Sequence, residues 1–129
     1  MRIEHVAIWV KDLEAMREFY ETYFEGRAGN KYHNPKKDFH SYFISFPNGP
    51  RIELMHRPEQ VKSINSEGFE IIGYAHLAFS LGSKTKVDGM TERFRSDGFR
   101  IVGEPRTTGD GYYESVVLDP EGNKIELTV

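Results

Sequence analysis

Alternating apolar and polar positions divide the chain into strand-like and helix-like stretches. Over residues 3–10, odd-numbered side chains share one face of a predicted strand and even-numbered ones share the other, because successive strand side chains point to opposite faces. From Asp12, a typical N-cap residue, apolar residues recur three or four positions apart as far as Phe24, which predicts an amphipathic helix closed by Gly26. Three further strands are expected at 27–32, 39–46 and 51–57.

The second half of the chain shows the same order of patterns. A strand at 74–81 precedes a thinner amphipathic helix that begins after Ser83 and ends near Gly98. Three more strands are expected at 99–103, 112–118 and 124–129. Residues 58–72 have no clean period and are interpreted as a linker between a module at 1–57 and a module at 73–129.

Two short segments occur once in each half. Residues 3–7 match 74–78, and each copy carries one histidine; residues 51–54 match 124–127, and each copy carries one glutamate. A duplicated strand-helix-strand-strand-strand unit cannot bury its own sheet face and needs its copy. We therefore expect an α+β fold: one domain over 1–129, in which two βαβββ modules form a curved mixed sheet around a cleft.

Composition narrows the function classes. The chain has 129 residues, a formal net charge of −3 and no cysteine. This charge gives no indication of nucleic-acid binding, and no apolar run approaches the length of a membrane span. The lack of cysteine excludes disulfides, thiolate metal ligands and a cysteine nucleophile. With no signal segment at the start, we expect a cytoplasmic protein.

Four polar residues interrupt the apolar strands at matched places of the repeat: His5, Glu53, His76 and Glu126. Any one of them alone is typical of an ordinary strand residue. Because the repeat makes them converge, together they predict a site for one divalent ion, with two nitrogen and two oxygen ligands suited to Ni, Co, Zn, Mn or Fe(II). The other histidines, His33, His40 and His56, are expected to be ordinary, with His56 on the strand face opposite Glu53.

On these residues the chain resembles the vicinal oxygen chelate superfamily, which includes glyoxalase I, methylmalonyl-CoA epimerase, fosfomycin-resistance thiol transferases, extradiol dioxygenases and bleomycin-binding proteins. The likeness covers the four candidate ligands, the helix at 12–24 and the Asp-Pro-Glu-Gly turn at 119–122. The complete His–Glu–His–Glu set is similar to bacterial glyoxalase I. The resemblance implies a homodimer, in which the site lies within one chain or is shared between subunits.

The chain departs from glyoxalase I at two positions. Where glyoxalase I carries an Arg four residues after its first histidine ligand, this chain has Trp9, and where it carries an Asn after the first glutamate, this chain has Arg57. The glutathione clamp is thus not reproduced, and the small-molecule substrate is left open. Arg57 and Arg106 are candidates for holding an anionic substrate, and Trp9, Phe43 and Tyr113 are candidates for lining the pocket.

The leading hypothesis is a metal-dependent lyase or isomerase of the lactoylglutathione lyase type. The ion would stabilise negative charge next to a substrate carbonyl while a carboxylate carries a proton between neighbouring carbons. By resemblance Glu126 is the first choice for this base, with Glu53 as ligand or second base. The alternatives are another metal chemistry of the superfamily, namely epimerisation, ring cleavage or thiol addition, and a non-catalytic binding protein of the resistance type.

Overall fold

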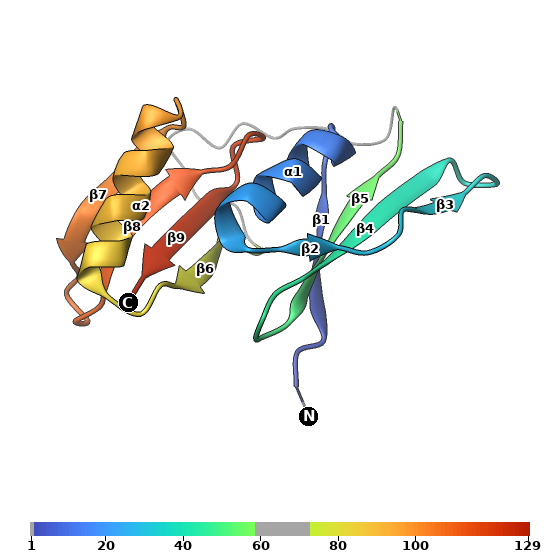
Figure 1. Cartoon of the computed structure of the whole chain (residues 1–129). Coiled ribbons are helices and arrows are strands. Elements are labelled where there is room, and N and C mark those ends of the chain that lie inside the picture. The colour runs from blue at the N-terminus through green and yellow to red at the C-terminus, as the bar shows by residue number, and fades with distance from the viewer. Residues whose placement is uncertain (1, 59–72) are drawn as a thin grey trace. The chain divides into compact units, whose positions relative to one another are not determined.

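The computed structural model describes residues 2–58 and 73–129 (Figure 1). The chain divides into two compact units, Met1–Asn65 and Ser66–Val129. Apart from Pro58, the predicted linker at 58–72 lies outside the described residues. No helix in the described ranges is long and apolar enough to cross a membrane.

The first unit is a mixed sheet with one helix. Strand β1 is parallel to β5, whereas β4 is antiparallel to β5, β2 and β3, in the order β1-β5-β4-β2 with β3 also paired to β4. The predicted strand at 27–32 is instead two short strands, since the intervening Gly29-Asn30 pair is a poor strand former. The elements are β1 (His5–Trp9), α1 (Leu13–Phe24), β2 (Arg27–Ala28), β3 (Tyr32–Asn34), β4 (Phe39–Ser45) and β5 (Arg51–His56).

The second unit repeats this plan with four strands in the order β6-β9-β8-β7. Here β6 is parallel to β9, and the other neighbours are antiparallel. The elements are β6 (His76–Ser80), α2 (Lys84–Ser96), β7 (Ile101–Thr107), β8 (Tyr113–Leu118) and β9 (Lys124–Thr128). The α+β class and the duplicated plan predicted from the sequence are therefore confirmed, as two mixed sheets, one in each unit.

Strand β7 corrects one prediction. The sequence placed a strand at 99–103 and a loop at 104–111, but the strand runs from Ile101 to Thr107. Its pairing with β8 is irregular on both sides of Gly103, and it contains Pro105. An edge strand tolerates both features, because one side of its backbone has no ladder to maintain.

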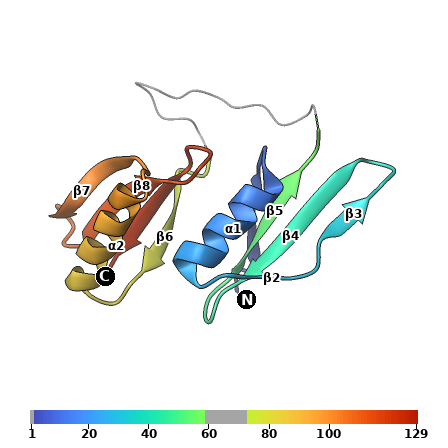
Figure 2. The same ribbon diagram turned by 45° about the horizontal axis from the view of Figure 1, so that its top comes forward.

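Each helix packs on one face of its own sheet (Figure 2). Helix α1 begins where Asp12 accepts a hydrogen bond from the Ala15 amide at 2.9 Å, and helix α2 begins where Ser83 accepts one from Lys86 at 3.3 Å. The buried core consists of the apolar side of each helix and the sheet residues beneath it, including Met16, Phe19, Tyr20, Ile44, Ile52, Leu54, Val87, Phe94, Val117, Ile125 and Leu127.

Gly26 has a different role from the one that the sequence suggested. The left-handed residue that ends α1 is Glu25, at φ 56°, and not Gly26. A Cβ at position 26 would lie 2.6 Å from the Ile44 side chain and 2.9 Å from the Tyr20 carbonyl oxygen. Position 26 is therefore glycine because the chain passes close to the core.

We expect Gly26→Ala to lower the free energy of unfolding by about 1–3 kcal/mol, the usual effect of overpacking. The matched control is Gly89→Ala inside α2, where an added Cβ meets nothing within 4 Å. Since alanine favours a helix interior, Gly89→Ala should raise stability by about 0.5–1 kcal/mol. Urea unfolding followed by circular dichroism measures both. Equal effects of the two substitutions would contradict the packing explanation.

Candidate functional site

In the first unit, His5 and Glu53 stand on neighbouring parallel strands. His5 on β1 is in register with Arg51 on β5, and Glu53 is in register with Ala7. His5 and Glu53 therefore share one face of the sheet, two positions apart along it. Nε2 of His5 lies 3.9 Å from Oε2 of Glu53.

In the second unit, His76 and Glu126 stand in the same relation. His76 on β6 is in register with Lys124 on β9, and Glu126 is in register with Ala78. Nε2 of His76 lies 3.1 Å from Oε2 of Glu126. The sequence repeat is thus also a repeat of geometry, with one His–Glu pair at the same place on each sheet.

Each glutamate lies on the sheet face opposite its buried apolar neighbours, as the strand alternation predicted. The neighbours of Glu126, Ile125 and Leu127, are fully buried beneath α2, and the glutamate is on the opposite face of the sheet. The side chains of Glu53 and Glu126 are 16% and 21% exposed, and both histidines are 39% exposed. Each unit therefore presents a largely covered carboxylate beside an accessible imidazole.

Glu4 is a further candidate residue of this site, which sequence reasoning missed. Its carboxylate lies 2.5 Å from Nδ1 of His5 and also binds Arg51, whose Nε is 2.8 Å away. The hydrogen bond from His5, followed by that from Arg51, holds the pKa of Glu4 below its usual value. An ionised carboxylate only accepts hydrogen bonds, so Nδ1 of His5 is the donor to Glu4, and Nε2 is the ring nitrogen that faces Glu53. The available signal was that Glu4 directly precedes His5, where the second unit has Ala75.

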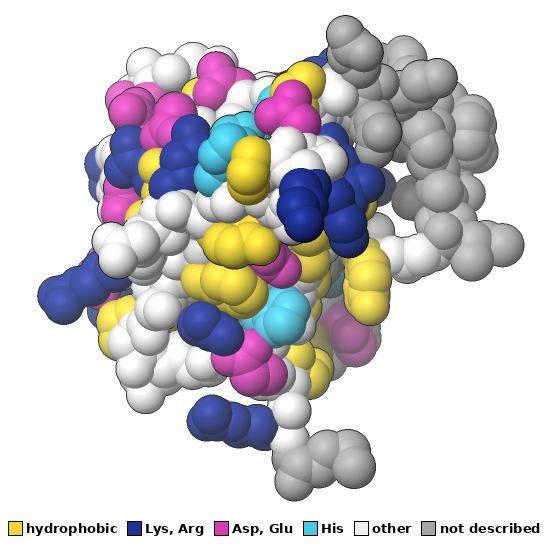
Figure 3. Space-filling model, turned by 90° about the vertical axis from the view of Figure 1, so that its right-hand side faces the viewer, with side chains coloured by type: hydrophobic (Ala, Val, Ile, Leu, Met, Phe, Trp, Pro, Cys, Tyr) yellow, Lys and Arg dark blue, Asp and Glu magenta, His cyan; other side chains and the backbone are white. Residues whose placement is uncertain are grey.

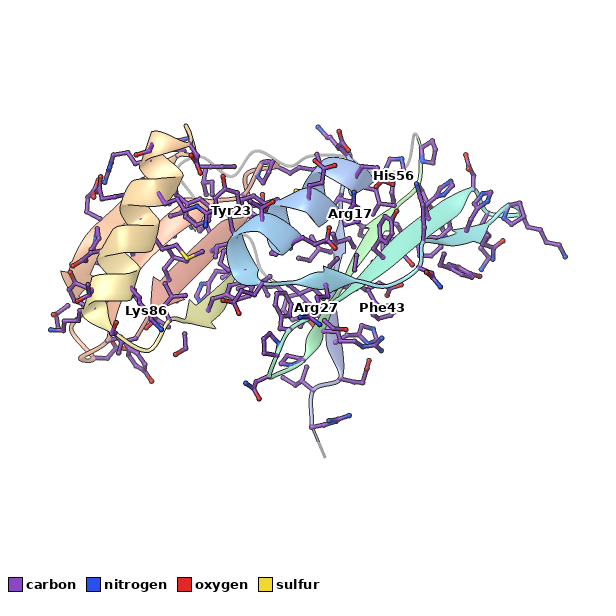
Figure 4. All side chains as sticks on the ribbon, in the orientation of Figure 1. Arg17, Tyr23, Arg27, Phe43, His56 and Lys86 are labelled. Atoms are coloured by element: carbon purple, nitrogen blue, oxygen red, sulfur yellow. The ribbon has the colours of Figure 1, made fainter. Side chains whose placement is uncertain are left out.

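The aromatic residues predicted near the site in the first unit lie on the His5 face. Phe43, labelled in Figure 4, is in register with Glu53. Its ring makes an edge contact with His5 at 5.2 Å between centroids. Trp9 makes an edge contact with Phe39 at 6.1 Å, and the Arg57 guanidinium lies 5.7 Å from both rings. This face therefore combines two candidate metal ligands with an aromatic and cationic surface.

Two predicted residues of the second unit fall on different faces. Arg106 on β7 is in register with Glu114 on β8, and Glu114 lies on the same face of the sheet as Glu126. Nη1 of Arg106 lies 3.8 Å from the Glu114 carboxylate. Tyr113 lies on the opposite, helix-covered face, where its hydroxyl donates to Asp88 at 2.6 Å. That hydrogen bond, together with burial, raises the pKa of Tyr113. The structure brings Arg106, but not Tyr113, to the His76–Glu126 face.

The two pairs fit a divalent ion. Two ligands of one ion lie at most about 4 Å apart, because metal–nitrogen and metal–oxygen bonds are about 2 Å long. The observed separations of 3.9 and 3.1 Å satisfy this limit. In each pair an imidazole nitrogen faces a carboxylate oxygen, and both atom types are ligands of divalent ions. A metal-ligating histidine commonly donates its other N–H to a carboxylate, as His5 does to Glu4.

The remaining histidines lie elsewhere on the first sheet. His56 is on the face opposite Glu53, as predicted, and its Nδ1 lies 2.9 Å from the Val10 carbonyl oxygen (Figure 4). His33 and His40 were expected to be ordinary residues that flank a loop. They do flank the loop at 35–38, and their rings stack across the hairpin of β3 and β4.

Comparison with known proteins identifies the family and supports the fold. The family model of the Glyoxalase/Bleomycin resistance protein/Dioxygenase superfamily matches residues 2–127. The chain belongs to this superfamily. The superfamily relative YqjT of Bacillus subtilis (strain 168), an uncharacterized protein, is 31% identical over 97% of this chain and 96% of its own length.

Solved structures of the superfamily share the fold. A glyoxalase family protein from Enterococcus faecalis has a TM-score of 0.80 at 23% identity, covering 98% of this chain and 96% of that one. The trypanothione-dependent glyoxalase I of Leishmania major has a TM-score of 0.78 at 22% identity, covering 99% of this chain and 86% of that one. At these identities the likeness establishes the fold, and the reaction is argued from the site.

Proposed function

We propose that the protein is a divalent-metal-dependent lyase or isomerase of glyoxalase type, which transfers a proton next to a carbonyl group. One observation carries this proposal: a His–Glu pair occurs in identical register on parallel strands of both units. Strand pairs that serve only the core have no need of an imidazole and a carboxylate at both copies. Conserving both groups through the duplication suits a symmetric N₂O₂ ligand set.

In this proposal a single ion is held by one His5–Glu53 pair and one His76–Glu126 pair. His5 and Glu53 supply one nitrogen and one oxygen, and His76 and Glu126 supply the others, from the same chain or from the two subunits of a homodimer. Four protein ligands leave further positions for substrate oxygens on ions that accept five or six ligands, such as Ni, Co, Mn or Fe(II), and on a five-coordinate Zn.

The chain's own residues would perform the proton transfer. The bound ion would supply Lewis-acid stabilisation of the negative charge that develops on the substrate oxygen. Glu126, the less enclosed carboxylate and the one nearer to its histidine, takes the proton from the carbon next to the carbonyl and returns it to the adjacent carbon. Glu53 remains a ligand and keeps the orientation that β5 gives it. Burial of the flanking strand residues fixes both carboxylates relative to their histidines.

The surface around His5 supports a substrate that carries an aromatic or flat apolar group and a negative charge. Trp9 is 48% exposed and offers its ring to such a group, while Arg57 supplies positive charge beside it. In the second unit, Arg106 adds a second cation on the Glu126 face. A carbonyl substrate that carries both a carboxylate and an aromatic or flat apolar group combines these features.

Metal analysis and a turnover screen test the proposal together. We expect purified protein, stripped with chelator and reloaded with Ni, Co, Zn, Mn or Fe(II), to bind one ion per site and to regain activity with at least one of them. The screen begins with methylglyoxal adducts of glutathione and of other thiols. Oxygen consumption with Fe(II) and a catechol would replace the proposal by ring cleavage, and tight ligand binding that survives chelation without any product would replace it by a binding function.

Glu4 provides a prediction that is independent of the substrate. We expect Glu4→Gln to weaken metal binding about 10–100-fold, because His5 loses the carboxylate that fixes its tautomer and direction. Metal affinity measured by competition with a chromophoric chelator checks this. The control is Glu18→Gln, an exposed carboxylate on α1 that lies 3.5 Å from Arg17 and should leave the affinity unchanged. Equal affinities of the two variants would remove Glu4 from the site.

A further inference from the structure

Two histidines stack across the hairpin formed by β3 and β4. His33 and His40 are cross-strand partners, with ring centroids 4.2 Å apart and an interplanar angle of 6°. Because the hairpin fixes their backbones opposite each other, the two imidazoles are held together by the fold. In a view of this side of the molecule, histidine side chains reach the surface beside acidic and basic residues (Figure 3).

The hairpin loop adds a carboxylate to this pair. Asp38, the last loop residue, has a φ of 45° and places Oδ1 3.3 Å from Nε2 of His40. Nδ1 of His40 is buried, so Nε2 is the nitrogen available to a ligand. One ligand atom from each of His33, Asp38 and His40 lies within 4.8 Å of the other two.

We propose that His33, Asp38 and His40 form a second divalent-metal site, separate from the His–Glu pairs. Ligands that share an ion lie at most about 4 Å apart, so these three must close by up to about 1 Å. Rotation of the His33 and Asp38 side chains, which are both exposed, supplies this movement. Two imidazoles and one carboxylate make a three-ligand set in which water takes the remaining position.

Position on the sheet separates this site from the proposed catalytic one. In the pairing of β4 with β5, His40 is in register with His56, on the face that carries α1, whereas Phe43 and Glu53 are on the other face. The two sets of candidate ligands in the first unit therefore lie on opposite faces. An ion at one set cannot be held by the other, and the second site does not depend on the proposed catalytic activity.

Charge and donor type select the ion. Calcium requires six to eight oxygen ligands, and this cluster offers one carboxylate and two nitrogens. Lys36 and Lys37, in the same loop, add positive charge that disfavours ions held mainly by electrostatic attraction. Imidazole nitrogen suits Zn, Ni and Cu(II). The inferred occupant is therefore an ion of the zinc type.

The consequence of binding is a clamp on the hairpin. Strand β3 has only three residues, and in the described part of the chain it is paired with β4 alone. Such a short edge strand is weakly held. An ion shared by His33, Asp38 and His40 would tie β3 and its loop to the sheet and would raise the midpoint of thermal unfolding.

The test uses tag-free, full-length protein that carries His5→Ala and His76→Ala, so that two ligands of the proposed catalytic site are absent. We expect this protein to bind one Zn²⁺ in isothermal titration calorimetry and to give a Cu²⁺ electron paramagnetic resonance spectrum with two coupled nitrogens. Adding His33→Asn should lower the zinc affinity at least about tenfold and leave one coupled nitrogen. The matched control adds Asp97→Asn, a half-exposed carboxylate of the second unit, and should change neither measurement.

The outcomes separate the two sites. If the His5/His76 variant binds one ion and the added His33→Asn abolishes that binding, the hairpin site is supported. This result does not depend on whether the catalytic proposal is correct. Absence of zinc binding by that variant at about 100 μM zinc, or binding unchanged by both His33→Asn and Asp38→Asn, overturns it. Circular dichroism spectra identical to the parent protein establish that each variant is folded.

Discussion

Replacing Glu126 with glutamine is expected to lower kcat by about 10²–10⁴-fold, the contribution usual for a positioned general base. Glutamine keeps the shape of the side chain and one oxygen, but it cannot accept a proton. KM should change far less than kcat, because the groups proposed to hold the substrate, Trp9, Arg57 and Arg106, are untouched. Steady-state kinetics with the substrate found in the turnover screen, at saturating metal, measure both parameters.

The metal content of each variant makes this result interpretable. Metal content must be determined for each variant, because Glu126 is also a proposed ligand; loss of the metal alone would be reversed by a higher metal concentration, and loss of the base would not.

Two control variants complete the comparison. Glu53→Gln is the matched replacement in the other copy of the repeat, and Glu92→Gln removes an exposed carboxylate that bonds Arg95 on α2. A larger loss in Glu53→Gln than in Glu126→Gln would exchange the roles of the two carboxylates. Full activity of both Glu53→Gln and Glu126→Gln would exclude proton transfer by Glu53 or Glu126.

Replacing Leu127 with alanine is expected to lower the free energy of unfolding by about 2–5 kcal/mol, as for other fully buried leucines. The loss combines the transfer free energy of the removed carbons with the cavity left between β9 and α2. Since a whole domain is stable by only about 5–15 kcal/mol, this is a large fraction of its stability. Urea unfolding followed by circular dichroism and by fluorescence measures the change.

The neighbouring residue supplies the contrast. The side chain of Glu126, one position earlier on the same strand, points away from that core. Glu126→Gln should therefore change the free energy of unfolding by less than about 1 kcal/mol. Leu54→Ala, the equivalent change in the first unit, should match Leu127→Ala, because Leu54 is equally buried. A stability loss in Glu126→Gln as large as that in Leu127→Ala would mean that its kinetic effect reflects unfolding.

Much of the fold was determined by local pattern. The helix at Leu13–Phe24 follows from apolar residues at helical spacing after an N-cap aspartate, and the strands that carry the four candidate ligands follow from alternation. These signals are strong because burial of one face requires an apolar residue in every turn of a helix or at every second position of a strand. The edge strand β7 was misplaced, because glycine and proline, which argue against a central strand, are tolerated where one side is unpaired.

The candidate site was predicted less completely. The repeat identified the two histidines and two glutamates, because a duplicated sequence repeats its geometry. Glu4 was missed, since Arg51, which binds its carboxylate beside His5, comes next to it only through the pairing of β1 with β5. Tyr113 was placed in the pocket because an aromatic strand residue has the same local pattern on either face, and its contact with Asp88 shows that it faces α2.

The sequence by itself thus determined the duplicated βαβββ plan, the core faces of the strands and the pairing of a histidine with a glutamate in each half, because periodicity and repetition are properties of the chain alone. The tertiary structure decided the parallel register that sets His76 3.1 Å from Glu126, the contact of Arg51 with Glu4 and the stacking of His33 on His40. Each of these depends on which strands become neighbours and in what register, and residues far apart in sequence acquire a distance only when the sheet forms.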